Sequence, residues 1–280
     1  MKYASPAAFR SALNTRLRAQ AAQAGTELSR LQRQLAYERF LTRLFTLVGE
    51  TWILKGGYAL ELRLGGRARA TRDLDFSAPG GTDLLDTLQD AAEHDLGDHF
   101  RFTVQAPDGG HLAGPPEGGQ RFRVSAYLDG VAPFAVFLLD VGQGDVVSTI
   151  DHLPPRVDVT FADLPSTPFP SYPLPEHFAE KLHAYTRPRP GGGQTRVKDL
   201  LDLSLIVTDL QLPPSREVWA VVAGVFARYA SHDLSPSVPS PPPDWRDPYS
   251  ALATATGHPV TDMNEAVTDI QRFLDACRVD

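Results

Sequence analysis

Two aspartates, Asp73 and Asp75, are the residues of this sequence with the clearest chemical potential. They lie in residues 72–77, where polar and apolar side chains alternate as in a half-buried strand. Positions i and i+2 of a strand point to the same face, so the two carboxylates would converge. Neighbouring like charges need a cation between them to stay ionised. Mg²⁺, or Mn²⁺ in its place, binds carboxylates and substrate phosphates, so the pair predicts a divalent-metal site.

A glycine pair, Gly56-Gly57, precedes the aspartates, and Asp73 follows Gly57 by sixteen residues. The apolar run 51–54 before the pair predicts a strand, and the pattern 58–62 after it predicts a helix. Glycine lets backbone N–H groups approach a triphosphate closely where a helix begins. Alone, an Asp-x-Asp is ordinarily a solvated strand face and a glycine pair is ordinarily a turn. In strand-turn-helix-strand order they together favour a site for a nucleoside triphosphate (NTP).

A two-metal site for phosphoryl transfer needs a further carboxylate. Asp140 is the best candidate, because it ends the apolar run 134–139, where a charge is costly to bury without a cation or a partner. The alternative is that Asp140 only opens the turn at Gly142. Asp129 and Asp145 are turn residues and poorer candidates.

A second group of charged residues lies in two helical segments that a Gly-rich stretch separates. Lys181, in the first segment, could neutralise charge on a triphosphate. Asp199, in the second, could orient Lys181 or act on the hydroxyl of an acceptor. The alternative is charge pairing on helix surfaces, for instance between Lys198 and Asp202 at i,i+4 spacing.

The periodicity of the remaining sequence predicts an α+β fold that would position these residues. We expect two helices within residues 5–47, with Ser5 as the first cap, and a helix near 82–95. Strands are expected near 100–105, 120–128 and 133–141, and helices at 175–187, 196–210, 215–231 and 260–277. The Pro-rich stretch 235–248 predicts an exposed connection. These elements predict three parts: an N-terminal helical layer (1–48), a catalytic core with a mixed sheet and flanking helices (49–170), and a C-terminal helical domain (171–280).

Composition limits the class of protein. The chain has 280 residues and 42% hydrophobic residues, enough for a folded protein of one or two domains. No apolar stretch approaches the roughly 20 residues of a membrane span, and the N-terminus lacks a signal-peptide run, so we expect a cytoplasmic protein without a membrane partner. The single cysteine, Cys277, cannot form an internal disulfide. A net charge of −7 argues against a general nucleic-acid coat but allows a local basic cleft.

The motifs resemble those of the AbiEii/AbiGii-type nucleotidyltransferase toxins, which include the MenT toxins and belong to the DNA polymerase β-like superfamily. The resemblance spans roughly residues 50 to 205 and is carried by four segments: 55–60, 69–75, 180–187 and 196–203. It implies a polymerase β-like catalytic domain, a helical C-terminal part and Mg²⁺-dependent use of an NTP. It also implies a toxin role with a cognate antitoxin, and some members modify the 3′ acceptor end of tRNA.

The resemblance also implies roles for individual residues. Asp73 and Asp75 would be metal ligands, Lys181 a catalytic or triphosphate-binding lysine, and Asp199 an acid of the catalytic site. Many members have serine where this chain has Gly57, so a hydroxyl contact is unavailable there. The residues that we expect to bind the nucleotide are Lys55, Gly56, Gly57, Arg72, Lys181, Arg196 and Lys198.

We therefore expect a metal-dependent enzyme that transfers a nucleotide to RNA, at the 3′ end of tRNA. A small-molecule or protein acceptor would fit the acidic net charge better, and a nucleotide-sensing or antitoxin-binding module without turnover is a further alternative. The sequence indicates no oligomeric state. If RNA is the acceptor, the arginines nearest the motifs would form its surface: Arg67, Arg69, Arg72, Arg187 and Arg196.

Overall fold

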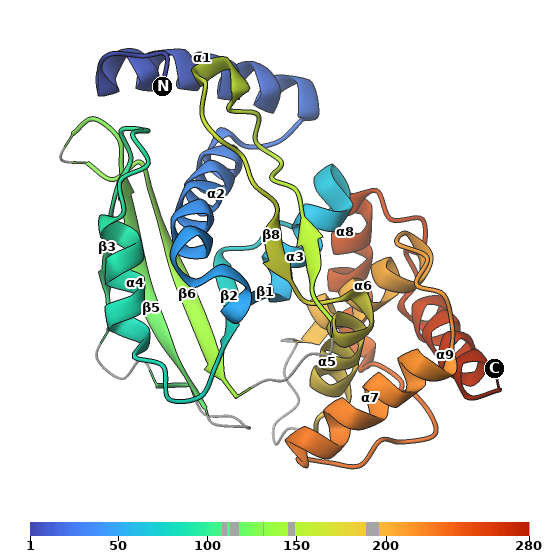
Figure 1. Cartoon of the computed structure of the whole chain (residues 1–280). Coiled ribbons are helices and arrows are strands. Elements are labelled where there is room, and N and C mark those ends of the chain that lie inside the picture. Colours follow the sequence, from blue (N-terminus) through green and yellow to red (C-terminus); the bar gives the residue numbers. More distant parts are fainter. Residues whose placement is uncertain (108–110, 113–117, 131, 145–148, 189–195, 280) are drawn as a thin grey trace. The chain divides into compact units, whose positions relative to one another are not determined.

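The computed structural model describes residues 1–107, 111–112, 118–130, 132–144, 149–188 and 196–279. The chain folds as two compact units. Unit 1 comprises Met1–Leu62 and Ala70–Ser171, and unit 2 comprises Arg63–Arg69 and Tyr172–Asp280. Unit 1 contains the β-sheet, whereas unit 2 is helical (Figure 1).

The sheet of unit 1 is mixed, as the sequence predicts. Its strand order is β3-β5-β6-β2-β1-β8-β7, and β4 pairs with β5. The central strand β2 pairs in parallel with β6 and antiparallel with β1. The strands are β1 (Ile53–Lys55), β2 (Asp73–Ala78), β3 (Arg101–Gln105), β4 (His111–Leu112), β5 (Gly119–Tyr127), β6 (Ala135–Gln143), β7 (Asp151–Leu153) and β8 (Phe169–Ser171).

The helices of unit 1 are α1 (Pro6–Ala24), α2 (Leu28–Val48) and α4 (Leu84–Glu93), together with α3 (Gly56–Leu64) as far as Leu62. Ser5 caps α1 as the sequence predicts, because its side chain accepts a hydrogen bond from the N–H of Ala8 at 3.3 Å. Helix α2 packs beside β6 and α4 beside β3 (Figure 1).

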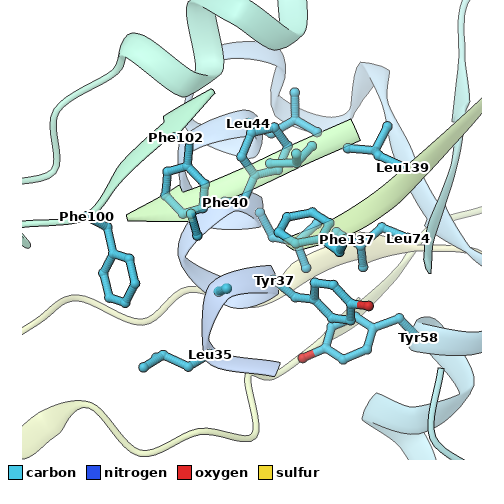
Figure 2. Packing of buried hydrophobic residues seen from close by; sticks show 14 of the residues in the cluster. Leu35, Tyr37, Phe40, Leu44, Tyr58, Leu74, Phe100, Phe102, Phe137 and Leu139 are labelled. Carbon is cyan, nitrogen blue, oxygen red and sulfur yellow. The ribbon is translucent and has the colours of Figure 1, made fainter. Parts of the chain in front are cut away.

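The core of unit 1 lies between these helices and one face of the sheet. Figure 2 shows Tyr37 and Phe40 of α2 against Phe137 of β6 and Phe102 of β3. The ring centroids of Tyr37 and Phe137 are 4.8 Å apart, and those of Phe40 and Phe102 are 5.4 Å apart, typical separations for aromatic pairs. Because buried residues alternate with more exposed ones along β3, β5 and β6, the helices cover only one face of these strands.

Unit 2 is built from α5 (Leu174–Thr186), α6 (Val197–Thr208), α7 (Arg216–Tyr229), α8 (Arg246–Thr256) and α9 (Met263–Val279). Helix α6 contributes its buried residues to packing against α5, α8 and α9. In the described ranges of the chain, no helix is long and apolar enough to cross a membrane.

The sequence did not predict β4, β7, β8 or α8. The first three are strands of two or three residues, too short for a periodic pattern. Helix α8 begins inside the stretch 235–248 that we expected to be an exposed connection, so that expectation was wrong beyond Pro242. Burial of Trp245 and Tyr249 anchors this segment and overrides the local effect of the prolines.

Candidate active site

Asp73 and Asp75 lie on one face of β2, as the alternating sequence predicts. Both side chains are partly exposed, whereas Leu74 is fully buried. The hydroxyl of Thr71 donates to Asp73 Oδ1 at 2.6 Å and so orients that carboxylate. Asp75 is paired in register with Asp140 of the parallel strand β6. The structure therefore brings three acidic residues of the sequence together on adjacent strands.

Gly56 is required by its position against Asp75. Its φ angle is +66°, a region that L side chains rarely adopt. A Cβ atom on Gly56 would lie 1.9 Å from Asp75 Oδ2 and 2.5 Å from Asp75 Cγ. Gly56 is also the first residue of α3, where backbone N–H groups have no acceptor within the helix. Asp75 thus lies where the helix end favours negative charge, and further anions can bind there.

Lys55 is the last residue of β1 and lies on the same face of the sheet as Asp75. It is paired in register with Asp75. Its Nζ atom is 3.7 Å from the position that a Cβ on Gly142 of β6 would occupy. The lysine therefore extends across β2 along the face that carries the carboxylates.

Asp140 has a partner that the sequence did not indicate. Arg121 of β5 donates to both carboxylate oxygens, from Nε to Oδ1 at 2.7 Å and from Nη2 to Oδ2 at 2.6 Å. This bidentate hydrogen bonding to Asp140 raises the pKa of Arg121. The cost of placing a charge at Asp140 is therefore met by Arg121, and a third metal ligand there stays a prediction. Asp145 lies outside the described residues.

The two carboxylates of β2 fit a metal ion whose other ligands are waters and substrate phosphates. In the part of the chain that the structure describes, no group of three or more His, Cys, Asp or Glu side chains is arranged to hold a metal. Mg²⁺ is commonly held by one or two carboxylates, with waters and substrate phosphates completing its shell. Asp73 and Asp75 provide that number, and the missing Cβ of Gly56 makes room for the Asp75 carboxylate.

Gly56→Ala should lower nucleotide transfer by about 100-fold or more, because the added methyl displaces the Asp75 carboxylate and strains a positive φ. Gly224→Ala is the matched control, since Gly224 lies within α7, has no positive φ, and a Cβ there would meet no atom within 4 Å. Steady-state rates of both variants would be compared at saturating NTP. Equal rates for the two variants would contradict the role of Gly56.

Unit 2 holds a separate cluster of charges around Lys181 of α5. The ammonium of Lys181 donates to Asp199 Oδ1 at 3.1 Å and contacts Asp202 Oδ2 at 3.0 Å. Arg69 binds Asp202 through two hydrogen bonds of 2.9 and 2.7 Å. Arg196 donates to Asp199 at 2.7 Å. The two carboxylates are nearly inaccessible, and Lys181 is 14% exposed.

The buried charges of this cluster stabilise each other. Burial opposes ionisation of Asp202, but Lys181 and Arg69 outweigh it and lower the pKa of Asp202 to about 2. Burial likewise opposes protonation of Lys181, but Asp202 and Asp199 raise its pKa above the usual value. Lys181 is therefore a cation at neutral pH. The sequence suggested pairing of Asp202 with Lys198, whereas Asp202 binds Arg69 and Lys181, and Lys198 is exposed.

His177 was not singled out in the sequence. It lies one helical turn before Lys181 on α5 and is 2% exposed. Burial and then the positive charge of Lys181 lower the pKa of His177 to about 3, so its ring is neutral at physiological pH. Neither ring nitrogen has a hydrogen-bond partner among the residues that the structure describes.

The arginines that the sequence suggested for binding RNA fall into two groups: some are exposed, and others form ion pairs within the protein. Arg72 and Arg187 are exposed. Arg67 binds Asp209 at 2.7 Å, while Arg69 and Arg196 belong to the cluster around Lys181. Three of the five arginines expected to bind RNA are thus engaged in ion pairs of unit 2.

Several solved structures resemble this chain at low identity. The nucleotidyltransferase toxin MenT4 of Mycobacterium tuberculosis is 21% identical, with 95% of this chain and 98% of that chain covered and a TM-score of 0.48. A Helicobacter pylori protein described as a nucleotidyltransferase is 12% identical, with 88% and 95% covered and a TM-score of 0.47. JHP933 of Helicobacter pylori is 13% identical, with 88% and 92% covered and a TM-score of 0.45. No curated protein matches the sequence.

A family model identifies the chain directly. The model of the nucleotidyl transferase AbiEii toxin, of type IV toxin–antitoxin systems, matches residues 39–276. This match includes β2 with its two aspartates, the glycine at the start of α3, and the cluster around Lys181. The chain therefore belongs to the AbiEii family of nucleotidyltransferase toxins.

Proposed function

We propose that this enzyme transfers a nucleotide from an NTP to RNA, at the 3′ end of tRNA, and acts in the cytoplasm as a toxin that a cognate antitoxin counteracts. The observation that carries the proposal is the position of Asp75 against Gly56 at the start of α3. Strand β2 offers carboxylates to a cation, and the start of α3 offers backbone N–H groups to phosphates. An NTP bound with its divalent metal presents both partners.

Each residue of unit 1 has a role in this proposal. Asp73 and Asp75 hold Mg²⁺ or Mn²⁺, which neutralises charge on the reacting phosphates when it is bound. The N–H groups of Gly56 and Gly57 bind phosphate oxygens at the helix start. Lys55, the last residue of β1, and Arg72, which directly precedes β2, add positive charge near the phosphates.

Lys181 and Asp199 of unit 2 serve the same reaction. Lys181 supplies a cation to the triphosphate, and its bonds to Asp199 and Asp202 keep it protonated and fixed in direction. Arg196 and Lys198 supply further positive charge. In the transfer, the hydroxyl oxygen of the acceptor forms a bond to the α-phosphorus, the bond to the β-phosphate bridge breaks, and pyrophosphate leaves. The hydroxyl proton passes to a base, for which Asp199 is the candidate of this unit.

The direct test incubates the purified chain with each α-labelled NTP, Mg²⁺ or Mn²⁺, and either total RNA or purified tRNA. We expect label in tRNA, at its 3′ end, with a preference for particular NTPs, and loss of labelling with EDTA. Label found only on a protein or a small molecule would overturn the RNA acceptor. Binding of NTP without any transfer would overturn the enzymatic proposal itself.

A further inference from the structure

On three neighbouring strands, β3, β5 and β6, the side chains of the face opposite the helices are exposed or partly exposed. On β6 this face carries Val136 and Leu138, two large hydrophobic side chains that are 37% and 36% exposed. On β3 and β5 the residues of the same face are exposed or partly exposed, while their neighbours in sequence are buried. We call these residues the open face: Arg101, Thr103, Gln105, Arg121, Arg123, Ser125, Tyr127, Val136, Leu138 and Asp140.

The open face is basic in an acidic protein. Strands β3 and β5 together contain three arginines and no acidic residue, although the whole chain has a net charge of −7. Arg121 is committed to Asp140. Arg101 and Arg123 are exposed and form no ion pair with any described residue. Two arginines are thus available to an external anion.

The register joins the open face to the candidate metal ligands. Across one row of the sheet, Asp73 is paired with Leu138, Leu138 with Arg123, and Arg123 with Gln105. Residues paired directly across strands share a face. Three interstrand spacings, about 14 Å, separate β2 from β3. A chain whose end lies at Asp73 and Asp75 can therefore cross β6 and β5 and reach β3 without leaving this face.

We propose that the open face is the platform on which the single-stranded end of the acceptor RNA lies, with phosphates bound by Arg101 and Arg123 and a base stacked on Tyr127. This inference rests on the proposed transfer to RNA and adds the surface that holds the acceptor.

The composition of the face matches what single-stranded RNA requires. Backbone phosphates are bound by arginine, unstacked bases pack on aromatic rings and apolar side chains, and base edges take hydrogen bonds from side chains such as glutamine, serine and threonine. Tyr127 is paired in register with Arg101, so the two side chains leave the sheet from neighbouring positions of this face. Leu138 lies between Arg123 and Asp73, and Val136 is on the same face of β6, so a terminal nucleotide would pack on these two side chains. A small-molecule acceptor would need no basic surface so far from the aspartates.

The test measures binding of labelled tRNA to the full chain by fluorescence anisotropy. For the double variant Arg101→Glu/Arg123→Glu, we expect a Kd at least about tenfold higher, and a salt dependence of log K that is shallower by about 0.7 to 0.9 per lost phosphate contact. Arg18→Glu is the matched control, since Arg18 is an exposed arginine of α1 outside the open face. The KM for NTP should be unchanged in both proteins.

A second pair of variants tests the stacked base. Tyr127→Ala should raise the Kd for tRNA by about tenfold, while Tyr127→Phe, which keeps the ring, should bind as the wild type does. The inference is overturned if Arg101→Glu/Arg123→Glu binds tRNA like the wild type, if Arg18→Glu weakens binding equally, or if the wild type does not bind RNA. The wild type could also bind tRNA but transfer no nucleotide. If the variants of the open face then bind tRNA less tightly and Arg18→Glu does not, the proposed function is overturned and the binding surface stands.

Discussion

Asp73→Asn and Asp75→Asn should each lower the rate of nucleotide transfer by about 1000-fold. Each change removes one anionic oxygen ligand but keeps the shape of the side chain. A metal ion supplies several kcal/mol to the transition state of phosphoryl transfer, and each 1.4 kcal/mol corresponds to a factor of ten. Single-turnover rates with saturating NTP and Mg²⁺ would measure the loss.

Both variants should fold, because the two side chains are partly exposed and asparagine keeps the shape of aspartate. The melting temperature of each variant should stay close to that of the wild type. Asp90→Asn, on the exposed side of α4, is a matched control for charge and should retain full activity. Wild-type rates in Asp75→Asn would show that the carboxylates of β2 do not hold the catalytic metal.

The sequence could predict these two aspartates because their signal is local. Alternation over 72–77 places both carboxylates on one face of a strand whatever its partners are. The strand, the glycine and the helix that follow one another around Gly56 are likewise set by nearby residues. The mixed sheet and the helical region followed from the same patterns, and the structure confirms them.

Side-chain contacts between different strands could not be predicted in this way. Arg121 meets Asp140 only because β5 pairs with β6 in one particular register, and a shift of one residue would turn Arg121 to the other face. The open face is hidden in sequence for the same reason, since its residues come from separate strands. Asp202 did leave a signal, because a carboxylate among Leu200, Leu201 and Leu203 on a buried helix needs cationic partners. The identity of those partners, Lys181 and Arg69, depends on packing within unit 2.

Because Asp202 is buried together with its cationic partners, we expect its removal to have a large effect on stability. Asp202→Ala should destabilise unit 2 by about 3 to 5 kcal/mol, because removing one partner of a buried ion pair leaves the other charge uncompensated. Arg69 would lose the carboxylate that accepts hydrogen bonds from its Nε and Nη2 atoms, and Lys181 would lose its contact with Asp202 but keep its bond to Asp199. Asp269→Ala is the matched control, since Asp269 pairs with the exposed Arg272 within α9 and such surface pairs contribute about 0 to 1 kcal/mol.

Urea unfolding in a Trp52→Phe background would measure the change, because the remaining tryptophans, Trp219 and Trp245, both lie in unit 2.

The pH dependence of the unfolding free energy distinguishes the contribution of the ion pair from that of the lost packing. The pKa of Asp202 is lowered from 3.8 to about 2, so its ionisation stabilises the fold above pH 4 and this contribution is lost as the pH falls toward 2. That shift corresponds to about 2 kcal/mol. The difference in unfolding free energy between wild type and Asp202→Ala should therefore shrink by about that amount between pH 5 and pH 2. A difference that stays constant over this range would mean that Asp202 acts through packing and not through its charge.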